Sequence, residues 1–352
     1  MKTVDDVFDP ARNSLNAIRL VLAATVIVSH SWLVNGLGLP PMVGGTDPGL
    51  VAVAGFFAIS GYLVTSSRLR SSSLWSYLWH RFLRIYPAFI VALIVVACVF
   101  APLSTIIDPS SDVDWGSAGL YVLSNAGLYL QQITVDHTLI NNPFPFVWNV
   151  PLWTLFYEAI CYLIMGLLVS LTPRRLLGPA LVALLAICTS ISLSFQIWPG
   201  TVVLPILENL TSLGSFFLAG AVLYQYRARV PSSGLLAVIA IALGVLLATV
   251  GVFKPLAAIA IAYVMLYAGS RVPLTAIGRS NDISYGMYIY GFPAQQLTML
   301  MLGGAVLPIW LFAIVSVVVA VPLAWLSWLA VEKPALRLRR VWRWPDAIRI
   351  AP

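Results

Sequence analysis

Charged side chains are scarce in this chain. Asp, Glu, Lys and Arg together make up 9% of its 352 residues, whereas 60% of the residues are hydrophobic. Ordinary soluble domains carry about a quarter charged residues. The composition therefore excludes a soluble protein and predicts an all-α polytopic membrane protein, because long apolar segments cross a bilayer as helices.

Cysteine and histidine are also few. The three cysteines, Cys98, Cys161 and Cys188, all lie in apolar segments. We interpret them as small buried hydrophobic residues, which excludes a disulfide framework. Two of the three histidines, His80 and His137, have no neighbours at metal-ligand spacing, so no metal site is expected.

Long hydrophobic runs are abundant, and ten of them reach spanning length. We expect the first run to stay in the protein as a membrane helix rather than to be cleaved as a signal peptide, since it lacks a small-residue cleavage site. The predicted helices cover residues 15–34, 49–67, 85–103, 150–171, 178–196, 205–226, 234–252, 254–270, 283–302 and 306–330.

The basic residues predict the orientation of these helices. With ten crossings, all Lys and Arg residues fall on one side except Arg19, inside a helix, and Lys254, in an opposite loop. Because basic residues concentrate in cytoplasmic loops, both termini are expected to be cytoplasmic. The net charge of +7 is thereby explained by orientation, and no nucleic-acid partner is expected.

The longest segment on the other side covers residues 104–149. Its part from Ala118 to Leu130 is moderately apolar but too short to span. It predicts a re-entrant or surface-lying helix that caps an externally facing cavity; a flexible loop is the alternative. We find no internal repeat, which counts mildly against the commonest transporter architectures.

Arg19 and His30 are the most informative pair. Eleven positions separate them (30 − 19), about three helical turns, so they project from nearly the same face about 16 Å apart along the axis. A charge inside a membrane helix costs at least about 2.5–3.5 kcal/mol, and such residues are functional candidates by default.

Glu158 is the second intramembrane candidate. Counted from the outer surface, it should lie at a depth similar to that of His30. A carboxylate facing a histidine would fix its tautomer and raise its basicity, as general-base catalysis requires. A structural hydrogen bond to a neighbouring helix is the alternative.

Several motifs in chain order resemble those of the acyltransferase-3 family of bacterial integral-membrane O-acyltransferases. The spacing of Arg19 and His30 matches the arginine-to-histidine spacing of that family. The other matching segments are Phe56-Phe57-Ala58-Ile59-Ser60-Gly61-Tyr62, Arg81-Phe82-Leu83-Arg84-Ile85-Tyr86-Pro87, Leu152-Trp153-Thr154-Leu155-Phe156-Tyr157-Glu158, Ile283-Ser284-Tyr285-Gly286-Met287-Tyr288 and Val331-Glu332-Lys333-Pro334. One departure stands out: Tyr290-Gly291-Phe292-Pro293 replaces the Trp-His pair that often precedes proline in the family.

The resemblance implies an acyltransferase domain over residues 1–334, a basic cytoplasmic tail over 335–352, and no fused extracytoplasmic hydrolase-like domain. It implies transfer of an acyl group, usually acetyl, from cytoplasmic acyl-CoA to a glycan or glycolipid hydroxyl across the bacterial inner membrane. Acyl-CoA is then a co-substrate, and no permanently bound cofactor is expected. The acceptor and the oligomeric state stay open.

The resemblance also distributes roles among the residues. His30 is expected to be the general base or to carry the acyl group, with Glu158 as its catalytic partner. Arg19, Arg81, Arg84 and Tyr86 are expected to bind the donor, and Ser60, Tyr62, Trp153, Tyr157 and Tyr285 to line the cavity or contact the acceptor. Two alternatives are a transporter or flippase that uses Arg19, His30 and Glu158 for gating or proton coupling, and a non-catalytic subunit of a glycan-export complex.

Overall fold

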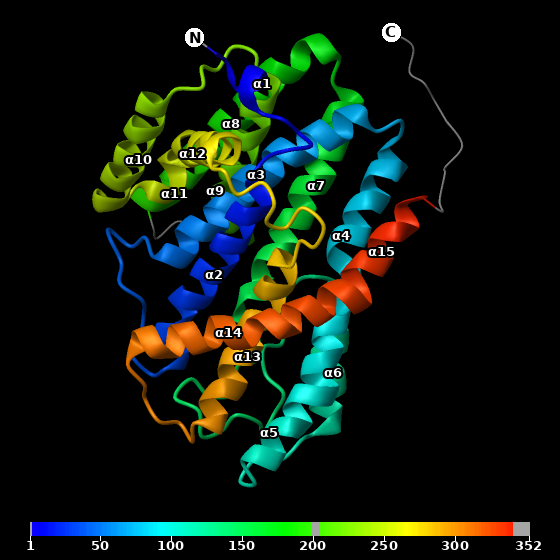
Figure 1. Ribbon diagram of the computed structural model, residues 1–352, viewed down its shortest axis with the longest axis vertical. Coiled ribbons are helices and arrows are strands. Elements are labelled where there is room, and N and C mark those ends of the chain that lie inside the picture. Colours follow the sequence, from blue (N-terminus) through cyan, green and yellow to red (C-terminus); the bar gives the residue numbers. More distant parts are fainter. Residues whose placement is uncertain (1, 199–204, 341–352) are drawn as a thin grey trace.

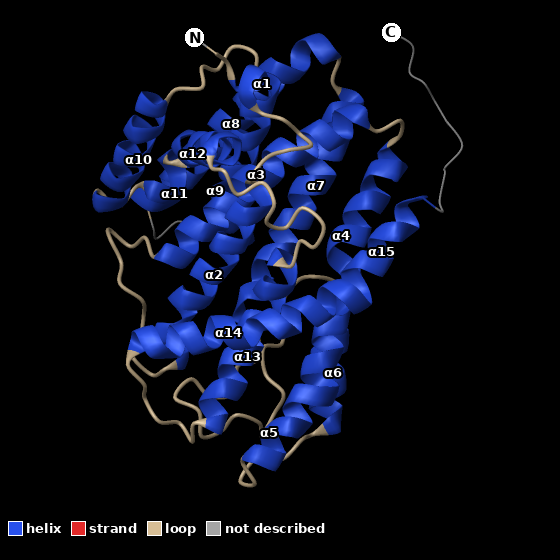
Figure 2. Cartoon of the chain, in the orientation of Figure 1, coloured by secondary structure: helices blue, strands red, loops and turns tan. Residues whose placement is uncertain are grey.

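The described chain is built from helices. The computed structural model describes residues 2–198 and 205–340, and within them the only β-type pairings are isolated bridges (Figure 2). The elements in Figure 1 are α1 Val4–Val7, α2 Leu15–Val34, α3 Pro48–Arg70, α4 Leu74–Val95, η1 Val96–Phe100, α5 Ala101–Ile107, α6 Trp115–Asn125, η2 Val150–Trp153, α7 Thr154–Leu171, α8 Arg174–Ile197, α9 Pro205–Gln225, α10 Gly234–Thr249, α11 Phe253–Leu256, α12 Ala258–Arg271, α13 Ser284–Met301, α14 Ile309–Ser327, η4 Trp328–Glu332, α15 Lys333–Arg337 and η5 Leu338–Arg340.

Each of the ten predicted apolar segments is helical, and two of the helices begin at a side-chain cap. The third begins at Leu74 rather than at residue 85, because the Ser73 side chain accepts a hydrogen bond from the Ser76 amide and starts the helix there. It continues through the π-helical turn η1 to Ile107. Similarly, the Asp47 carboxylate accepts from the amides of Gly49 and Leu50 and begins α3.

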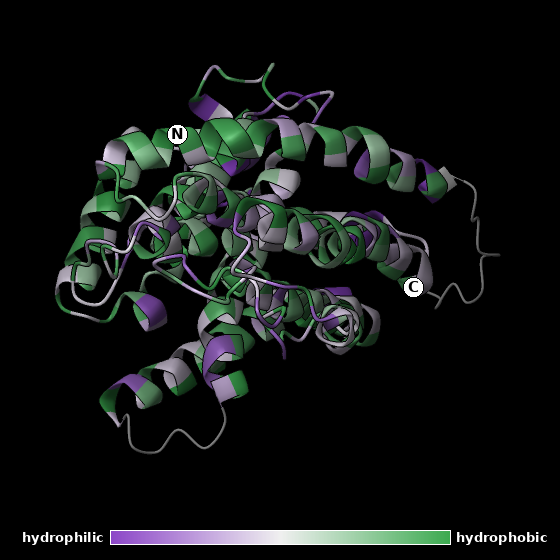
Figure 3. Cartoon of the chain, turned by 90° about the horizontal axis from the view of Figure 1, so that it is seen from below, coloured by the Kyte–Doolittle hydropathy of each residue, from purple (hydrophilic) through white to green (hydrophobic). Residues whose placement is uncertain are grey.

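In the part of the chain that the structure describes, seven helical segments are long and apolar enough to cross a membrane, so the chain is a multi-pass membrane protein. They are Leu15–Val34, Pro48–Arg70, Leu74–Ile107, Val150–Leu171, Arg174–Ile197, Pro205–Gln225 and Ile309–Arg337. Of the other three predicted spans, α10 and α12 are shorter apolar helices, and α13 is buried along almost its whole length. Hydrophobic residues are frequent along the helical ribbons in Figure 3, as expected of membrane helices.

Helices α3 and α9 form the centre of the bundle, and two glycines set their separation. A Cβ on Gly61 would lie 1.8 Å from the Phe217 carbonyl oxygen, and one on Gly220 would lie 2.0 Å from the Ala58 carbonyl oxygen. No larger residue fits at either position without separating the helices. The small residues of α3 therefore form a close-packing surface against α9.

The outer segment 104–149 is ordered by side-chain hydrogen bonds rather than being a flexible loop. It contains α6, which packs against α4 and η1, as the predicted helix required. Asn125 closes the turn after α6 by bonding the backbone of Gln131 and Gln132. Further along, Asn149 donates to the Ile289 carbonyl on α13, so the segment is anchored to the bundle.

Candidate active site

A pocket of about 350 Å³ contains His30. Its walls come from α2, the α2–α3 loop, the start of α3, the region before α7, α9 and α11. We call it the outer pocket. Its α2 residues, from Val26 onward, belong to the C-terminal half of that helix, which the sequence predicts to be on the outer side. Its polar and aromatic lining side chains are Ser29, His30, Asp47, Trp153, Thr154, Asn209, Ser212, Lys254 and Tyr288.

The hydrogen bonding of His30 fixes its tautomer. Nδ1 lies 2.8 Å from the Val26 carbonyl oxygen, one turn earlier in α2. A carbonyl oxygen only accepts, so Nδ1 carries the proton and donates it. In the neutral ring Nε2 is then unprotonated, and its lone pair can accept a proton, as a general base requires.

Phe292 packs edge-on to the His30 ring, with ring centroids 5.4 Å apart, and Phe144 packs against Phe292 in turn. Phe292 directly precedes Pro293. In the family that the sequence resembles, the residue at the position of Phe292 is often a histidine. At this position the chain therefore supplies an apolar support for the imidazole.

Asp47 is the carboxylate that shares the outer pocket with His30. Its Oδ1 accepts from Ser29 Oγ at 2.9 Å, from the Gly49 amide at 2.7 Å and from the Leu50 amide at 3.1 Å. Sequence reasoning missed this residue, although Asp before Pro-Gly at the start of an apolar run was a signal for a helix cap.

A second, smaller pocket of about 40 Å³ lies between α2, α3, α7 and α13. We call it the inner pocket. Its polar lining side chains are Arg19, Thr154, Glu158, Ser284, Tyr285 and Tyr288. At this volume the inner pocket is far smaller than the roughly 300–1,000 Å³ of a typical small-molecule site.

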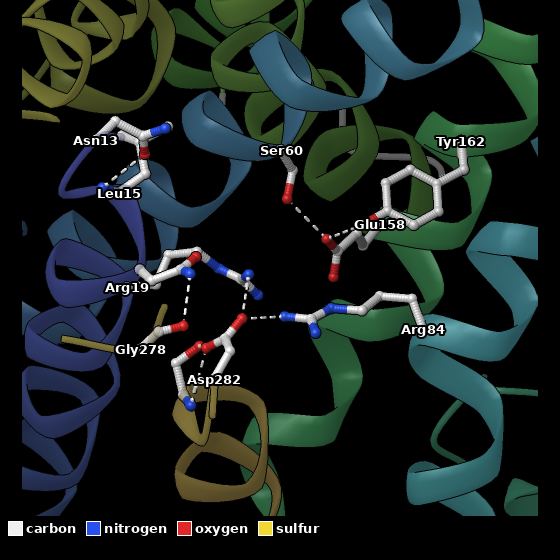
Figure 4. A network of polar contacts seen from close by, with 11 residues as sticks. Asn13, Leu15, Arg19, Ser60, Arg84, Glu158, Tyr162, Gly278 and Asp282 are labelled. Atoms are coloured by element: carbon white, nitrogen blue, oxygen red, sulfur yellow. Dashed lines mark hydrogen bonds and ion pairs between the residues drawn. The ribbon is translucent and has the colours of Figure 1, made fainter. Parts of the chain in front are cut away.

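Two arginines meet one carboxylate oxygen beside the inner pocket (Figure 4). Asp282 Oδ2 lies 3.0 Å from Arg19 Nη1 and 2.6 Å from Arg84 Nη2. Burial alone would raise the pKa of Asp282, but the two guanidinium groups and the Ser284 hydroxyl outweigh it and hold the pKa of that carboxyl well below its usual range. Asp282 thus stays ionised and holds two cations together.

The predicted pairing of Glu158 with His30 is wrong. Glu158 accepts hydrogen bonds from Ser60 Oγ at 2.8 Å and from the Tyr162 hydroxyl, and it lines the inner pocket with Arg19 (Figure 4). A depth counted along the sequence does not say which neighbouring helix a side chain meets. Glu158 meets Ser60 of α3 and Tyr162 of its own helix.

The two pockets share a boundary. Val53, Thr154 and Tyr288 line both of them, and we call these three residues the neck. The Tyr288 hydroxyl lies 2.7 Å from the Pro151 carbonyl and also bonds the Thr154 hydroxyl. A ligand that reached from Arg19 to His30 would have to pass the neck.

The remaining donor-site candidates divide between two places. Arg84 joins Arg19 at Asp282, as above. Arg81 and Tyr86 instead line an apolar groove of about 260 Å³ between α4 and α7, where the Arg81 guanidinium lies 5.9 Å from the Tyr162 ring centroid. The structure therefore does not bring Tyr86 to Arg19.

The predicted cavity-lining residues are also divided. Trp153 lines the outer pocket and Tyr285 the inner one, while Ser60 binds Glu158. Tyr157 packs against Trp153 and accepts from Asn209 at 3.3 Å. Tyr62, however, packs between Phe8 and Tyr224 and lines neither pocket.

The expected cap over the outer cavity comes from a different segment. Residues of the α2–α3 loop, including Leu39, Pro40 and Met42, line the outer pocket, whereas none of 104–149 does. The long outer segment packs instead on α13, where Asn142 donates to Gln296 at 2.9 Å. It therefore supports Phe292, and through it His30, from behind.

The fold and the site together define a multi-pass membrane protein with a histidine-bearing pocket joined by the neck to an arginine-bearing one. The acyltransferase 3 family, described as an acyltransferase domain, matches residues 12–329. The chain belongs to this family and is a membrane acyltransferase.

Two curated relatives match over nearly their whole length. An "O-acetyl transferase" from Shigella phage Sf6 is 28% identical over 330 residues, covering 91% of this chain and 95% of the relative. "Nodulation protein 10" from Rhizobium leguminosarum bv. viciae is 29% identical over 362 residues, covering 93% of this chain and 94% of the relative. No solved structure matches the chain significantly.

Proposed function

We propose that this protein is an O-acyltransferase that moves an acyl group, most simply acetyl, from cytoplasmic acyl-CoA to a hydroxyl of an extracytoplasmic glycan or glycolipid. The supporting observation is His30, whose free Nε2 belongs to a pocket large enough for a sugar residue and adjoining the arginine-lined inner pocket. The O-acetyl transferase relative supports the choice of a hydroxyl acceptor.

In the proposed reaction, His30 Nε2 takes the proton from the acceptor hydroxyl. The hydroxyl oxygen attacks the thioester carbonyl carbon, the carbon–oxygen bond forms, and the carbon–sulfur bond breaks. The departing CoA thiolate then takes the proton from the imidazolium, which returns His30 to its neutral form. Charges and atoms balance without a covalent acyl-enzyme, and Val26 keeps the ring in one tautomer throughout.

The arginines would hold the donor on the inner side. Arg19 and Arg84 each donate one hydrogen bond to Asp282. Their remaining N–H groups could bind phosphate or the thioester carbonyl. Since the inner pocket is far smaller than a typical small-molecule site, donor entry requires the neck and the arginines to move apart. Glu158 balances their charge from α7.

The proposal also fixes a topology. The domain would lie in the bacterial cytoplasmic membrane with both termini in the cytoplasm, the arginines near the inner surface and His30 near the outer one. A transporter or flippase that moves a polar substrate through the neck is the alternative, and it would leave the thioester intact.

The test uses purified protein in detergent, acyl-CoA and a deacylated surface glycan from the producing cell. His30→Gln can still donate to Val26 but cannot take up a proton, so release of CoA and ester formation should both fall at least a hundredfold. His137→Asn, at an exposed position with positive φ that Asn tolerates, is the matched control and should retain activity. Ester formation at the wild-type rate by His30→Gln would remove the proposed mechanism.

A further inference from the structure

Lys254 is the one Lys or Arg residue among the described residues that line the outer pocket. It lies in α11, the short helix between α10 and α12. The three lysines of the chain are Lys2, Lys254 and Lys333, and the other two fall on the opposite side in the proposed topology. The basic residues avoid the outer side, so an ammonium there runs against the trend of the whole chain.

Within residues 2–198 and 205–340, no partner neutralises this ammonium. Among the described residues, Lys254 forms no ion pair and no hydrogen bond, and the Asp47 carboxylate in the same pocket is not within ion-pair distance of it. A lysine that only anchored the helix at the membrane surface would point to water or headgroups. Lys254 instead lines the wall of the pocket that holds His30.

The rest of the pocket suits a sugar ring. Trp153 offers an aromatic face, and Asn209 and Asp47 offer an amide and a carboxylate to hydroxyl groups. A volume of about 350 Å³ is at the lower end of the range for small-molecule sites and fits one sugar residue. With hydroxyls bound by the other groups, the ammonium is left for an anionic substituent.

We propose that Lys254 makes the outer pocket specific for an acidic acceptor sugar, one that carries a carboxylate or a phosphate near the hydroxyl that is acylated. This inference rests on the proposed function for the meaning of the pocket and adds the chemical class of the acceptor. A charge-assisted hydrogen bond to the ammonium would hold the acid group while His30 faces the hydroxyl.

The experiment compares chemically matched forms of one glycan. The deacylated surface glycan is used native, after reduction of its carboxyl groups to alcohols, and after removal of its phosphates with hydrofluoric acid. KM for acylation and equilibrium binding, followed by tryptophan fluorescence, are measured for wild type, Lys254→Gln and Lys254→Arg. Lys2→Gln removes an exposed charge elsewhere and is the control.

In wild type, removing the relevant acid group should raise KM and the dissociation constant roughly tenfold, the usual effect of losing a charge-assisted bond. In Lys254→Gln the ratio between neutralised and native glycan should fall to about one, and Lys254→Arg should keep most of it. If carboxyl reduction raises KM, the acid group is a carboxylate; if phosphate removal raises it, the acid group is a phosphate. Equal KM values for all three glycans in wild type, or an unchanged ratio in Lys254→Gln, would overturn the inference.

The binding readout separates this inference from the proposed function. Charge-dependent binding that is lost in Lys254→Gln, with no acyl transfer to any glycan, supports the acidic ligand and removes the acyltransfer proposal. Acyl transfer at the same KM for native and neutralised glycan supports the acyltransfer proposal and removes the inference of an acidic acceptor.

Discussion

Arg19 and Arg84 come from helices distant in sequence, yet their guanidinium groups share a single oxygen of Asp282. Two like charges this close repel strongly when they are buried, and the Asp282 carboxylate is the group that makes their proximity tolerable. The arrangement concentrates positive charge beside the inner pocket without leaving either cation alone. Asp282 therefore acts by positioning the arginines, rather than through contact with substrate.

At the residue scale, Asp282→Asn should destabilise the protein. It removes the one carboxylate that both largely buried guanidinium groups contact, and removing one partner of a buried pair costs about 3–5 kcal/mol. We expect a loss of several degrees in the melting temperature in detergent. Asp5→Asn removes the exposed partner of Arg227 and should cost less than about 1 kcal/mol. Equal melting temperatures for Asp282→Asn and wild type would show that the shared carboxylate does not hold the arginines.

The pH dependence of this effect has a defined sign. Because the pKa of Asp282 is depressed in the fold, its contribution to stability is fully present above its unfolded value of about 3.9 and is lost as the pH falls through the lower folded value. The difference in melting temperature between wild type and Asp282→Asn should stay constant from pH 8 to pH 5. If the difference in melting temperature disappeared by pH 6, Asp282 would become protonated near that pH, and the arginines would not be lowering its pKa.

At the element scale, the contact of α3 with α9 supports both pockets, since α3 carries Val53 of the neck and α9 carries Asn209 of the outer pocket. Gly220→Val should prevent this contact, because a Cβ at that position falls on the Ala58 carbonyl oxygen. We expect loss of the monodisperse peak in size-exclusion chromatography. Gly214→Ala, on the same helix with nothing within 4 Å of the new Cβ, should behave as wild type. A well-folded Gly220→Val variant would refute the tight crossing.

The positions of the membrane helices were predictable from the sequence, because long apolar runs with few charged residues form such helices. Arg19 and His30 were visible because a charge or an imidazole is rare in an apolar run. Asp47 and Asp282 were not, because they lie outside the long apolar helices, where charged residues are ordinary. Lys254 stood out only by its side of the membrane, and the fold is what brings it to a pocket. Glu158 was recognised as a candidate, but its partners, Ser60 and Tyr162, were not predicted, because the rotation of one helix against another cannot be read from hydropathy.

At the scale of the whole molecule, the proposed topology can be tested by labelling. In a background with Cys98, Cys161 and Cys188 replaced by serine, Ser110→Cys should react with a membrane-impermeant maleimide on intact spheroplasts. Ser72→Cys, exposed between α3 and α4, should react only after the membrane is opened. The opposite pattern would invert the orientation and place His30 on the cytoplasmic side.

The central claim is that the donor and the acceptor meet from opposite sides of the membrane. Its most direct test uses proteoliposomes with the deacylated glycan enclosed and acyl-labelled acyl-CoA added outside, after outward-facing and inward-facing populations are defined by the Ser72→Cys label. The account predicts labelled ester on the enclosed glycan, formed in proportion to the population whose Ser72 side faces outward, and none with His30→Gln. Ester that forms only when both substrates are on the same side of the membrane would contradict it.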